Sequence, residues 1–112
     1  MTTITYHRGI KCSIRIEGHA CAAPAPGESD LCCAAESMLA CTLVRTVEML
    51  PLAKRYIYVT EGCVCVSFCT LCPAGLGGLA ALSTVINGFK LLTEQYPENV
   101  KLVRQRRLAK GE

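Results

Sequence analysis

The feature that most constrains the fold is a run in which apolar and polar residues alternate strictly from position 10 to position 17. The apolar members are Ile10, Cys12, Ile14 and Ile16, and the polar members are Lys11, Ser13, Arg15 and Glu17. Because successive side chains of a β-strand point to opposite faces, this pattern predicts a strand with one face in a core and the other in water. The chain must therefore cover one face of a sheet and leave the other open.

A second strand and a helix are predicted in the first half of the chain. Residues 4–6 form a short apolar run before the alternating strand, and Arg8-Gly9 between the two fits a hairpin turn. From about residue 31 to residue 50 the apolar spacing becomes helical, and Pro51 ends that run. One face of this predicted helix carries Ala35, Leu39, Leu43, Thr46 or Val47, and Leu50.

The second half of the chain repeats a hairpin followed by a helix. Residues 56–59 and 63–69 predict two strands around Glu61-Gly62, with Val64, Val66 and Phe68 on one face and Cys63, Cys65, Ser67 and Cys69 on the other. A second helix is marked by Leu79, Leu82, Ile86, Phe89 and Tyr96 and ended by Pro97, and residues 99–103 fit a short strand. We predict an α+β fold, a ββαββα two-layer sandwich whose four-stranded antiparallel sheet carries two helices on one face.

Composition points to a single folded domain in a reducing compartment. Of 112 residues 51% are hydrophobic and 19% charged, which argues against disorder. One domain is expected over residues 1–112, with residues 100–112 as a basic tail that is in part disordered. The nine cysteines are odd in number and residues 1–8 show no secretory leader pattern. We therefore expect a cytoplasmic protein in which most cysteines are buried as small hydrophobic residues.

Residues 62–89 carry no charge, a length that a membrane span would need. Pro73 and several glycines interrupt this stretch, so a strand, a turn and a buried helix explain it better than a membrane span. An uncharged helix rich in small residues also indicates a further buried surface, which a homodimer interface would supply.

One histidine and one cysteine carry the chemistry. Gly18-His19-Ala20 closes the alternating strand, and Cys33 opens the first predicted helix. If Asp30 caps that helix, Cys33 lies in its first turn, where free amides and the helix dipole favour a thiolate and could hold an oxyanion. His19 would then take the thiol proton and later protonate a leaving amine. A cysteine protease is the leading hypothesis.

The segment Asp30-Leu31-Cys32-Cys33-Ala34-Ala35-Glu36-Ser37, together with Gly18-His19, resembles the ribosomal-processing cysteine protease (Prp) family. The resemblance covers nearly the whole chain, and it places Cys32 at a position that is usually aliphatic. It implies Cys33 as the nucleophile and His19 as the general base, with Asp30, Ser37 and Gly18 in supporting positions.

The resemblance also implies a substrate and an assembly. Members trim the N-terminal extension of the bacterial large-subunit ribosomal protein L twenty-seven, so a peptide groove near Cys33 is expected. They are homodimers with no metal or organic cofactor. The loop between His19 and Cys33 departs from the family because it holds Pro24 and Pro26 and looks longer than usual.

Two other readings stay open. Cys63, Cys65, Cys69 and Cys72 could hold structural zinc or an iron–sulfur centre, although the first two alternate with valines as in a strand. The basic tail could instead mark a non-catalytic, ribosome-associated scaffold that binds RNA or protein. The basic residues of the tail are not interleaved with aromatic residues, which counts against RNA binding.

Overall fold

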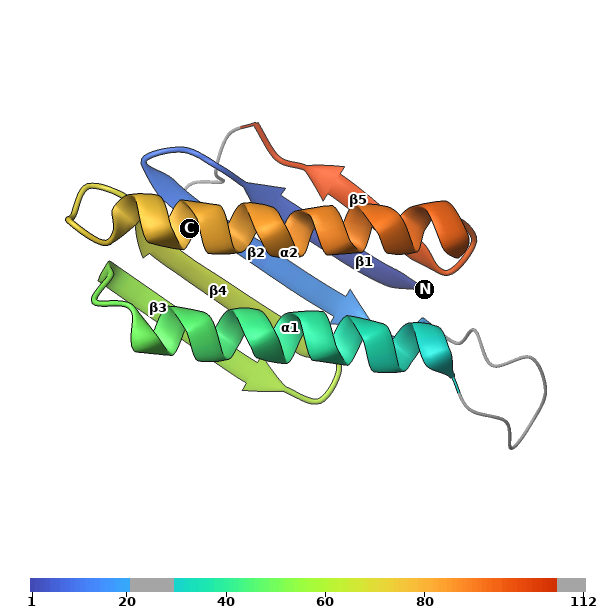
Figure 1. Cartoon of the computed structure of the whole chain (residues 1–112). Coiled ribbons are helices and arrows are strands. Elements are labelled where there is room, and N and C mark those ends of the chain that lie inside the picture. The colour runs from blue at the N-terminus through green and yellow to red at the C-terminus, as the bar shows by residue number, and fades with distance from the viewer. Residues whose placement is uncertain (21–29, 107–112) are drawn as a thin grey trace.

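A five-stranded sheet with two helices on one face forms the fold in the computed structural model, which describes residues 1–20 and 30–106 (Figure 1). The strands are β1 (Thr2–His7), β2 (Lys11–Gly18), β3 (Ala53–Thr60), β4 (Cys63–Cys69) and β5 (Val100–Arg104). The helices are α1 (Leu31–Met49) and α2 (Gly75–Gln95). The predicted α+β class and the ββαββα order are confirmed, and a fifth strand follows them.

The strands lie in the order β3-β4-β2-β1-β5. Neighbours are antiparallel except β1 and β5, which run parallel from the pair Thr2–Val100 to the pair Tyr6–Arg104. The prediction of a four-stranded antiparallel sheet is therefore wrong in two respects. The sheet has five strands, and it is mixed because β5 runs parallel to β1. The expected strand at residues 99–103 does form, as β5. Its pairing with the first strand of the chain was not predicted, because a strand of five residues carries too little pattern to indicate its partner.

The residue before β5 ties the sheet to the end of β2. The Asn99 carbonyl accepts a hydrogen bond from the Thr2 backbone N–H at 2.9 Å, and the Asn99 side-chain amide donates to the Ala20 carbonyl at 2.9 Å. Asn99 thus joins the first strand, the last strand and the segment that follows His19.

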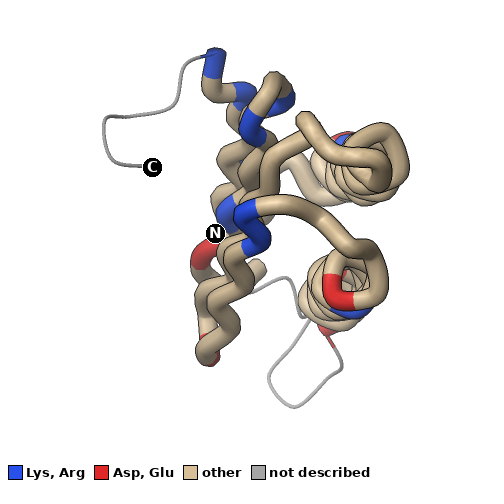
Figure 2. The backbone as a smooth tube through the Cα atoms, turned by 90° about the vertical axis from the view of Figure 1, so that its left-hand side faces the viewer, with Lys and Arg blue, Asp and Glu red and all other residues tan. Residues whose placement is uncertain are grey.

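The alternation of β2 appears as predicted from Cys12 onward, but Ile10, which was predicted on the buried face, lies before the strand and is 65% exposed. Cys12, Ile14 and Ile16 are buried under the helices, while their polar neighbours lie on the open face. Figure 2 shows both helices on the same side of the sheet. Val66 and Phe68 of β4 complete the core, again as predicted.

The helix α2 packs on the sheet through Leu82, Ile86 and Phe89, which are fully buried. By length and composition it is the one helix of the described residues that could cross a membrane, and 39% of its apolar window is buried inside the protein. Its buried stripe is that of a core helix.

The buried face of α1 differs from the prediction. The core side chains are Cys32, Glu36, Ala40, Leu43 and Val47, whereas the predicted Ala35 and Leu39 lie half-buried at the border. The reason is that Glu36, a charged residue that does not count toward the apolar spacing, occupies a core position.

The cysteines are less buried than expected. Eight lie in the described residues, all as free thiols, and only Cys12 and Cys32 are fully buried. Four of the others come from β4 and the turn after it, and three of those alternate onto the open face of the sheet. Side-chain alternation, rather than hydrophobicity, decides their exposure.

Candidate active site

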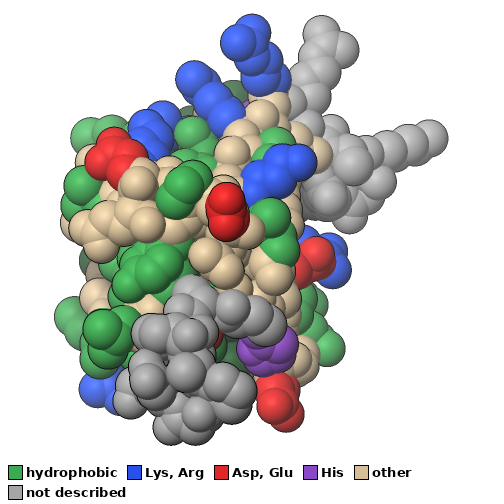
Figure 3. Space-filling model, turned by 90° about the vertical axis from the view of Figure 1, so that its right-hand side faces the viewer, with side chains coloured by type: hydrophobic (Ala, Val, Ile, Leu, Met, Phe, Trp, Pro, Cys, Tyr) green, Lys and Arg blue, Asp and Glu red, His purple; other side chains and the backbone are tan. Residues whose placement is uncertain are grey.

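The two residues singled out by the sequence lie at one end of the sheet. There, β1 begins, β2 ends, the β3–β4 turn closes and α1 begins (Figure 1). In the space-filling view of that end, a histidine lies at the surface beside acidic and apolar side chains (Figure 3).

Gly18 ends β2 in a conformation that few other residues adopt. Its φ is 95°, and a Cβ added there would lie 2.4 Å from the Met1 carbonyl oxygen. The Gly18 N–H donates to the Gly62 carbonyl at 2.9 Å. Glycine therefore suits this turn, which sets the direction of the next residue, His19.

His19 is exposed and its backbone is anchored. Its carbonyl accepts a hydrogen bond from the Met1 amino group at 2.7 Å. Its ring lies against the β3–β4 turn, since a Cβ at Gly62 would stand 3.4 Å from His19 Nε2. A glycine in that turn leaves room for the imidazole, which stays open to solvent.

Cys33 lies in the first turn of α1, as predicted. Asp30 is the N-cap, and its carboxylate accepts a hydrogen bond from the Cys33 backbone N–H at 2.8 Å. The Cys33 side chain is half-buried. A thiol in this position lies beside the free amides and the positive end of the helix dipole.

The neighbouring Cys32 points the other way, into the core. Burial raises the pKa of Cys32 to about 11, with smaller contributions from the charges of Glu36, Asp30 and Cys33. A thiol that remains protonated and is 1% exposed is a poor nucleophile. The helix thus leaves Cys33, rather than Cys32, partly accessible at the surface.

The other predicted supporting residue is placed differently. Ser37 lies one turn after Cys33 and is exposed. Its side chain makes no hydrogen bond within the described residues. Asp30 and Gly18 shape the site through the backbone, whereas Ser37 faces solvent on the same helix.

Glu36 was not foreseen as a site residue. It is 5% exposed, and its Oε1 accepts a hydrogen bond from Thr2 Oγ1 at 3.0 Å. Burial raises the pKa of Glu36 above its usual range, Thr2 and the Met1 amino group act in the opposite direction, and so does His19. The signal was available, because Glu36 follows Cys32 by one turn and precedes Ala40 by another.

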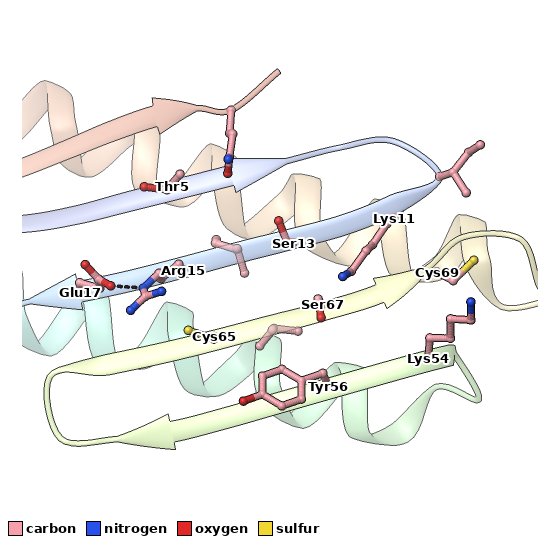
Figure 4. Close-up of a pocket in the computed structure, with 14 residues that line it drawn as sticks. Thr5, Lys11, Ser13, Arg15, Glu17, Lys54, Tyr56, Cys65, Ser67 and Cys69 are labelled. Carbon is pink, nitrogen blue, oxygen red and sulfur yellow. Dashed lines mark ion pairs between the residues drawn. The ribbon is translucent and has the colours of Figure 1, made fainter. Parts of the chain in front are cut away.

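The cysteines considered for a metal do not converge. Cys63 and Cys65 have their sulfurs 3.8 Å apart, while the Cys69 sulfur accepts a hydrogen bond from the Leu71 N–H. In residues 1–20 and 30–106 no group of three or more potential ligands comes together. Cys65 and Cys69 instead line a hollow of about 1040 Å³ on the open face of the sheet (Figure 4).

Some predictions fall outside the described residues. The loop that holds Pro24 and Pro26 lies at residues 21–29, and the end of the basic tail lies at residues 107–112. Residues 100–104 of that predicted tail form β5.

A half-buried thiol in the capped first turn of a helix and a histidine at the same end of the sheet are the residue types that a thiol hydrolase uses. The chain belongs to the cysteine protease Prp family, whose family profile matches residues 1–101. It is therefore a cysteine protease of the Prp family.

Solved structures show the same fold. The ribosomal processing protease Prp from S. aureus, with a covalently linked product peptide, matches with a TM-score of 0.76 and 19% identity over 94% of this chain and 100% of that one. The same protease with a substrate peptide has a TM-score of 0.68 and 18% identity over 94% and 100%. A protein from Streptococcus mutans has a TM-score of 0.63 and 24% identity over 94% and 96%. No curated protein matches the chain by sequence.

Proposed function

We propose that this chain is a cytoplasmic cysteine endopeptidase that removes the N-terminal extension of ribosomal protein L twenty-seven. Cys33 is its nucleophile and His19 its general base. The observation that carries the assignment is the register of α1, which buries Cys32 and leaves Cys33 half-buried above the Asp30 cap. The family and the peptide-bound structures of the S. aureus protease support it.

The chemistry follows from the two side chains. His19 takes the proton from Cys33 Sγ, and the thiolate attacks the carbonyl carbon of the scissile peptide bond. The tetrahedral intermediate collapses when His19 returns the proton to the leaving amine, and a thioester on Cys33 remains. Water then attacks the thioester with His19 as base, which releases the new carboxylate and restores the thiol.

The backbone of α1 supplies the electrostatic part of the reaction. The first amides of a helix have no carbonyl partner within the helix. The amides of Cys33 and Ala34 already donate to Asp30, so we assign the amides of Leu31 and Cys32 to the oxygen that becomes negative as the carbonyl is attacked. No metal or organic cofactor is needed for this sequence of steps.

We also propose that the protein acts as a homodimer. Leu76 and Leu91 on α2 and Met38 on α1 are largely exposed on the outer side of the helices. A second copy placed there would bury this apolar surface without covering the end of the sheet that carries His19. The molar mass in solution, measured by light scattering, tests this point.

The cleavage experiment uses the L twenty-seven precursor of the source organism and intact mass as the readout. The wild type and Cys32→Ala should release the same trimmed product, whereas Cys33→Ala should release none. Cleavage by Cys33→Ala would refute the assigned nucleophile. No cleavage by a folded wild type, with an extension present in the precursor, would refute the proposed substrate.

A second candidate, an RNA-binding scaffold, is favoured by one observation. Lys11 and Arg15 of β2 surround the hollow on the open face, together with Lys54 and Tyr56 of β3 (Figure 4). Such a basic face with an aromatic ring suits single-stranded RNA. Fluorescence anisotropy with a labelled oligonucleotide tests it. Equal binding by the wild type and by Lys11→Ala/Lys54→Ala would exclude this face.

A further inference from the structure

Two thiols contact each other on the open face of the sheet. Cys63 and Cys65 lie two positions apart on β4, and their sulfurs are 3.8 Å apart. Because side chains two positions apart on a strand point to the same face, both lie on the face that carries no helix (Figure 2). Both are free thiols and both are half-buried. The pair is therefore a dithiol that a small molecule can reach from solvent.

The spacing of the pair permits a disulfide and makes it a strained one. A strand rises about 3.3–3.4 Å per residue, so the Cα atoms of Cys63 and Cys65 are about 6.7 Å apart by strand geometry. Disulfide-bonded cysteines usually have Cα atoms about 4.4–6.8 Å apart, which puts this pair at the upper limit. Because β4 is paired with β2 on one side and with β3 on the other, it resists contraction. Strained disulfides are easily reduced, so a bond here would be reversible.

The surroundings of the pair are basic. Cys65 lines the hollow of about 1040 Å³ on the open face (Figure 4). The basic residues that line the same hollow are Lys11, Arg15 and Lys54. In the β2–β4 register Arg15 lies opposite Cys65, while Glu17 lies opposite Cys63 and forms an ion pair with Arg15. With three basic residues and one acidic residue among the described lining, the hollow attracts small anions.

We propose that Cys63 and Cys65 form a redox-active dithiol site, which an anionic low-molecular-weight disulfide such as oxidised glutathione converts to a reversible disulfide. The thiolate of one cysteine attacks a sulfur of the small disulfide, forms a mixed disulfide and releases one small thiolate. The second protein thiolate attacks the protein-bound sulfur and releases the other small thiolate. The protons of the two protein thiols pass through solvent to the two released thiolates. Two protein thiols are thus oxidised, and one small disulfide is reduced to two thiols.

Oxidation of the pair reaches the candidate active site through the β3–β4 turn. Cys63 directly follows Gly62 in that turn. The Gly62 carbonyl accepts the Gly18 N–H at 2.9 Å, and the His19 ring lies against the same glycine. A disulfide draws the start of β4 together, so the turn and the His19 ring should shift. The importance of this shift for catalysis rests on the proposed function, whereas the dithiol site does not.

The first experiment maps the disulfide in Cys33→Ala, which removes the proposed nucleophile and leaves the pair unchanged. The protein is treated with oxidised glutathione at pH 8, the remaining thiols are blocked with iodoacetamide, and chymotrypsin then cleaves after aromatic residues. The released peptide, residues 59–68, holds Cys63 and Cys65 and no other cysteine. By mass spectrometry it should have lost two hydrogen atoms, and dithiothreitol should restore them.

A second experiment tests the charge of the ligand. Oxidised glutathione is anionic and cystamine is a cationic disulfide, and each rate is divided by the rate of the same reagent with an unstructured cysteine peptide. We expect the normalised rate to be about tenfold higher with oxidised glutathione at low salt, and the difference to shrink at high salt. Lys11→Ala/Lys54→Ala should lose most of this preference. Lys90→Ala, which removes an exposed lysine of α2, should keep it.

A third measurement follows the candidate active site without a substrate. The chain has two histidines, His7 and His19, so the signals of their ring protons can be assigned by NMR. Oxidation of the pair in Cys33→Ala should shift the His19 signal and leave that of His7, at the other end of β1, in place. The matched control adds Cys63→Ser/Cys65→Ser to the same background and should show no shift after the same treatment.

Each result separates the parts of the proposal. A peptide of residues 59–68 that stays reduced, or that keeps glutathione on both cysteines, would overturn the dithiol site. Equal normalised rates with the two reagents would overturn the anionic ligand, and an unmoved His19 signal in the oxidised protein would overturn the effect on the active site. Cys69→Ser, which removes another thiol of β4, should behave as the wild type. No readout uses cleavage, so failure of the proposed function is distinguishable from failure of this site.

Discussion

The two ends of α1 differ in how completely their polar groups are hydrogen-bonded. At the C-terminal end Arg55 Nη1 donates to the carbonyls of Val47 at 3.1 Å, Glu48 at 3.0 Å and Leu50 at 2.9 Å. Toward the N-terminal end, one buried oxygen of the Glu36 carboxyl has no hydrogen-bond partner within residues 1–20 and 30–106. The hydrogen bonds of Arg55 at one end of the helix stabilise the fold. The buried Glu36 carboxyl toward the other end lowers stability and lies near the Cys33 thiol.

The largest expected effect is at the N-terminal end. Cys33→Ala should lower cleavage of the precursor peptide by at least about a thousandfold, because no other group there can form the thioester. Its thermal unfolding should stay close to that of the wild type, since the Cys33 side chain is only half-buried. The two results together, by peptide assay and circular dichroism, would establish that this end serves function.

The matched control for that variant is its neighbour. Cys32→Ala should keep most activity but lose on the order of 1 kcal/mol of unfolding free energy, because its side chain is fully buried. An inactive, stable Cys32→Ala would reverse the assignment of the two thiols.

His19→Ala should lower activity by about a hundredfold to ten-thousandfold, the usual contribution of a general base. The control is His7→Ala, because the His7 ring donates to the Gln105 carbonyl on the far side of β1. Equal losses in the two variants, measured as kcat/KM, would contradict a specific role for His19.

Arg55→Ala should lower stability rather than activity. It removes three hydrogen bonds to the last carbonyls of α1, and we expect a loss of about 1–3 kcal/mol in urea unfolding with activity preserved at low temperature. Arg45→Ala, an exposed arginine on the same helix, should be neutral. A large loss of activity in an Arg55→Ala variant that stays stable would contradict the view that the C-terminal end of α1 serves stability and the N-terminal end serves function.

The smallest effect is the dependence of stability on pH at Glu36. Burial raises the pKa of Glu36, so the folded protein holds this proton more tightly than the unfolded chain, where a glutamate titrates at about 4.3. Stability from this group is therefore complete below about pH 4 and is lost as pH rises through the folded pKa. Glu36→Gln should unfold at the same temperature as the wild type at low pH and at a higher temperature at pH 8. A constant difference would mean that Glu36 does not titrate as expected.

Much of the fold was predictable because its periodicity is local. The alternation in β2 and in β4 reports directly which side chains face the helices. The parallel β5 was not predictable in its pairing, because Val100 and Leu102 give only two apolar points and the partner strand is at the other end of the chain. The face of α1 was misjudged for a different reason, since a glutamate at a core position breaks the apolar pattern.

The residues of the candidate site were also predictable only where the signal is local. His19 and Cys33 lie in short motifs next to a strand end and a helix start, so their neighbourhood could be predicted. Gly62 and Thr2 could not, because each comes from another strand and contacts the site only after the sheet has formed. Local sequence specifies the reacting groups, and tertiary packing specifies what surrounds them.

The contacts of Asn99 set the order in which the molecule can be completed. Asn99 bonds to Ala20, a residue 79 positions earlier in the chain, and its carbonyl holds the N–H of Thr2. Contacts between such distant segments close late in folding, because a long loop must be ordered before they form. During synthesis the end of the sheet next to His19 therefore stays unfinished until the last strand has left the ribosome.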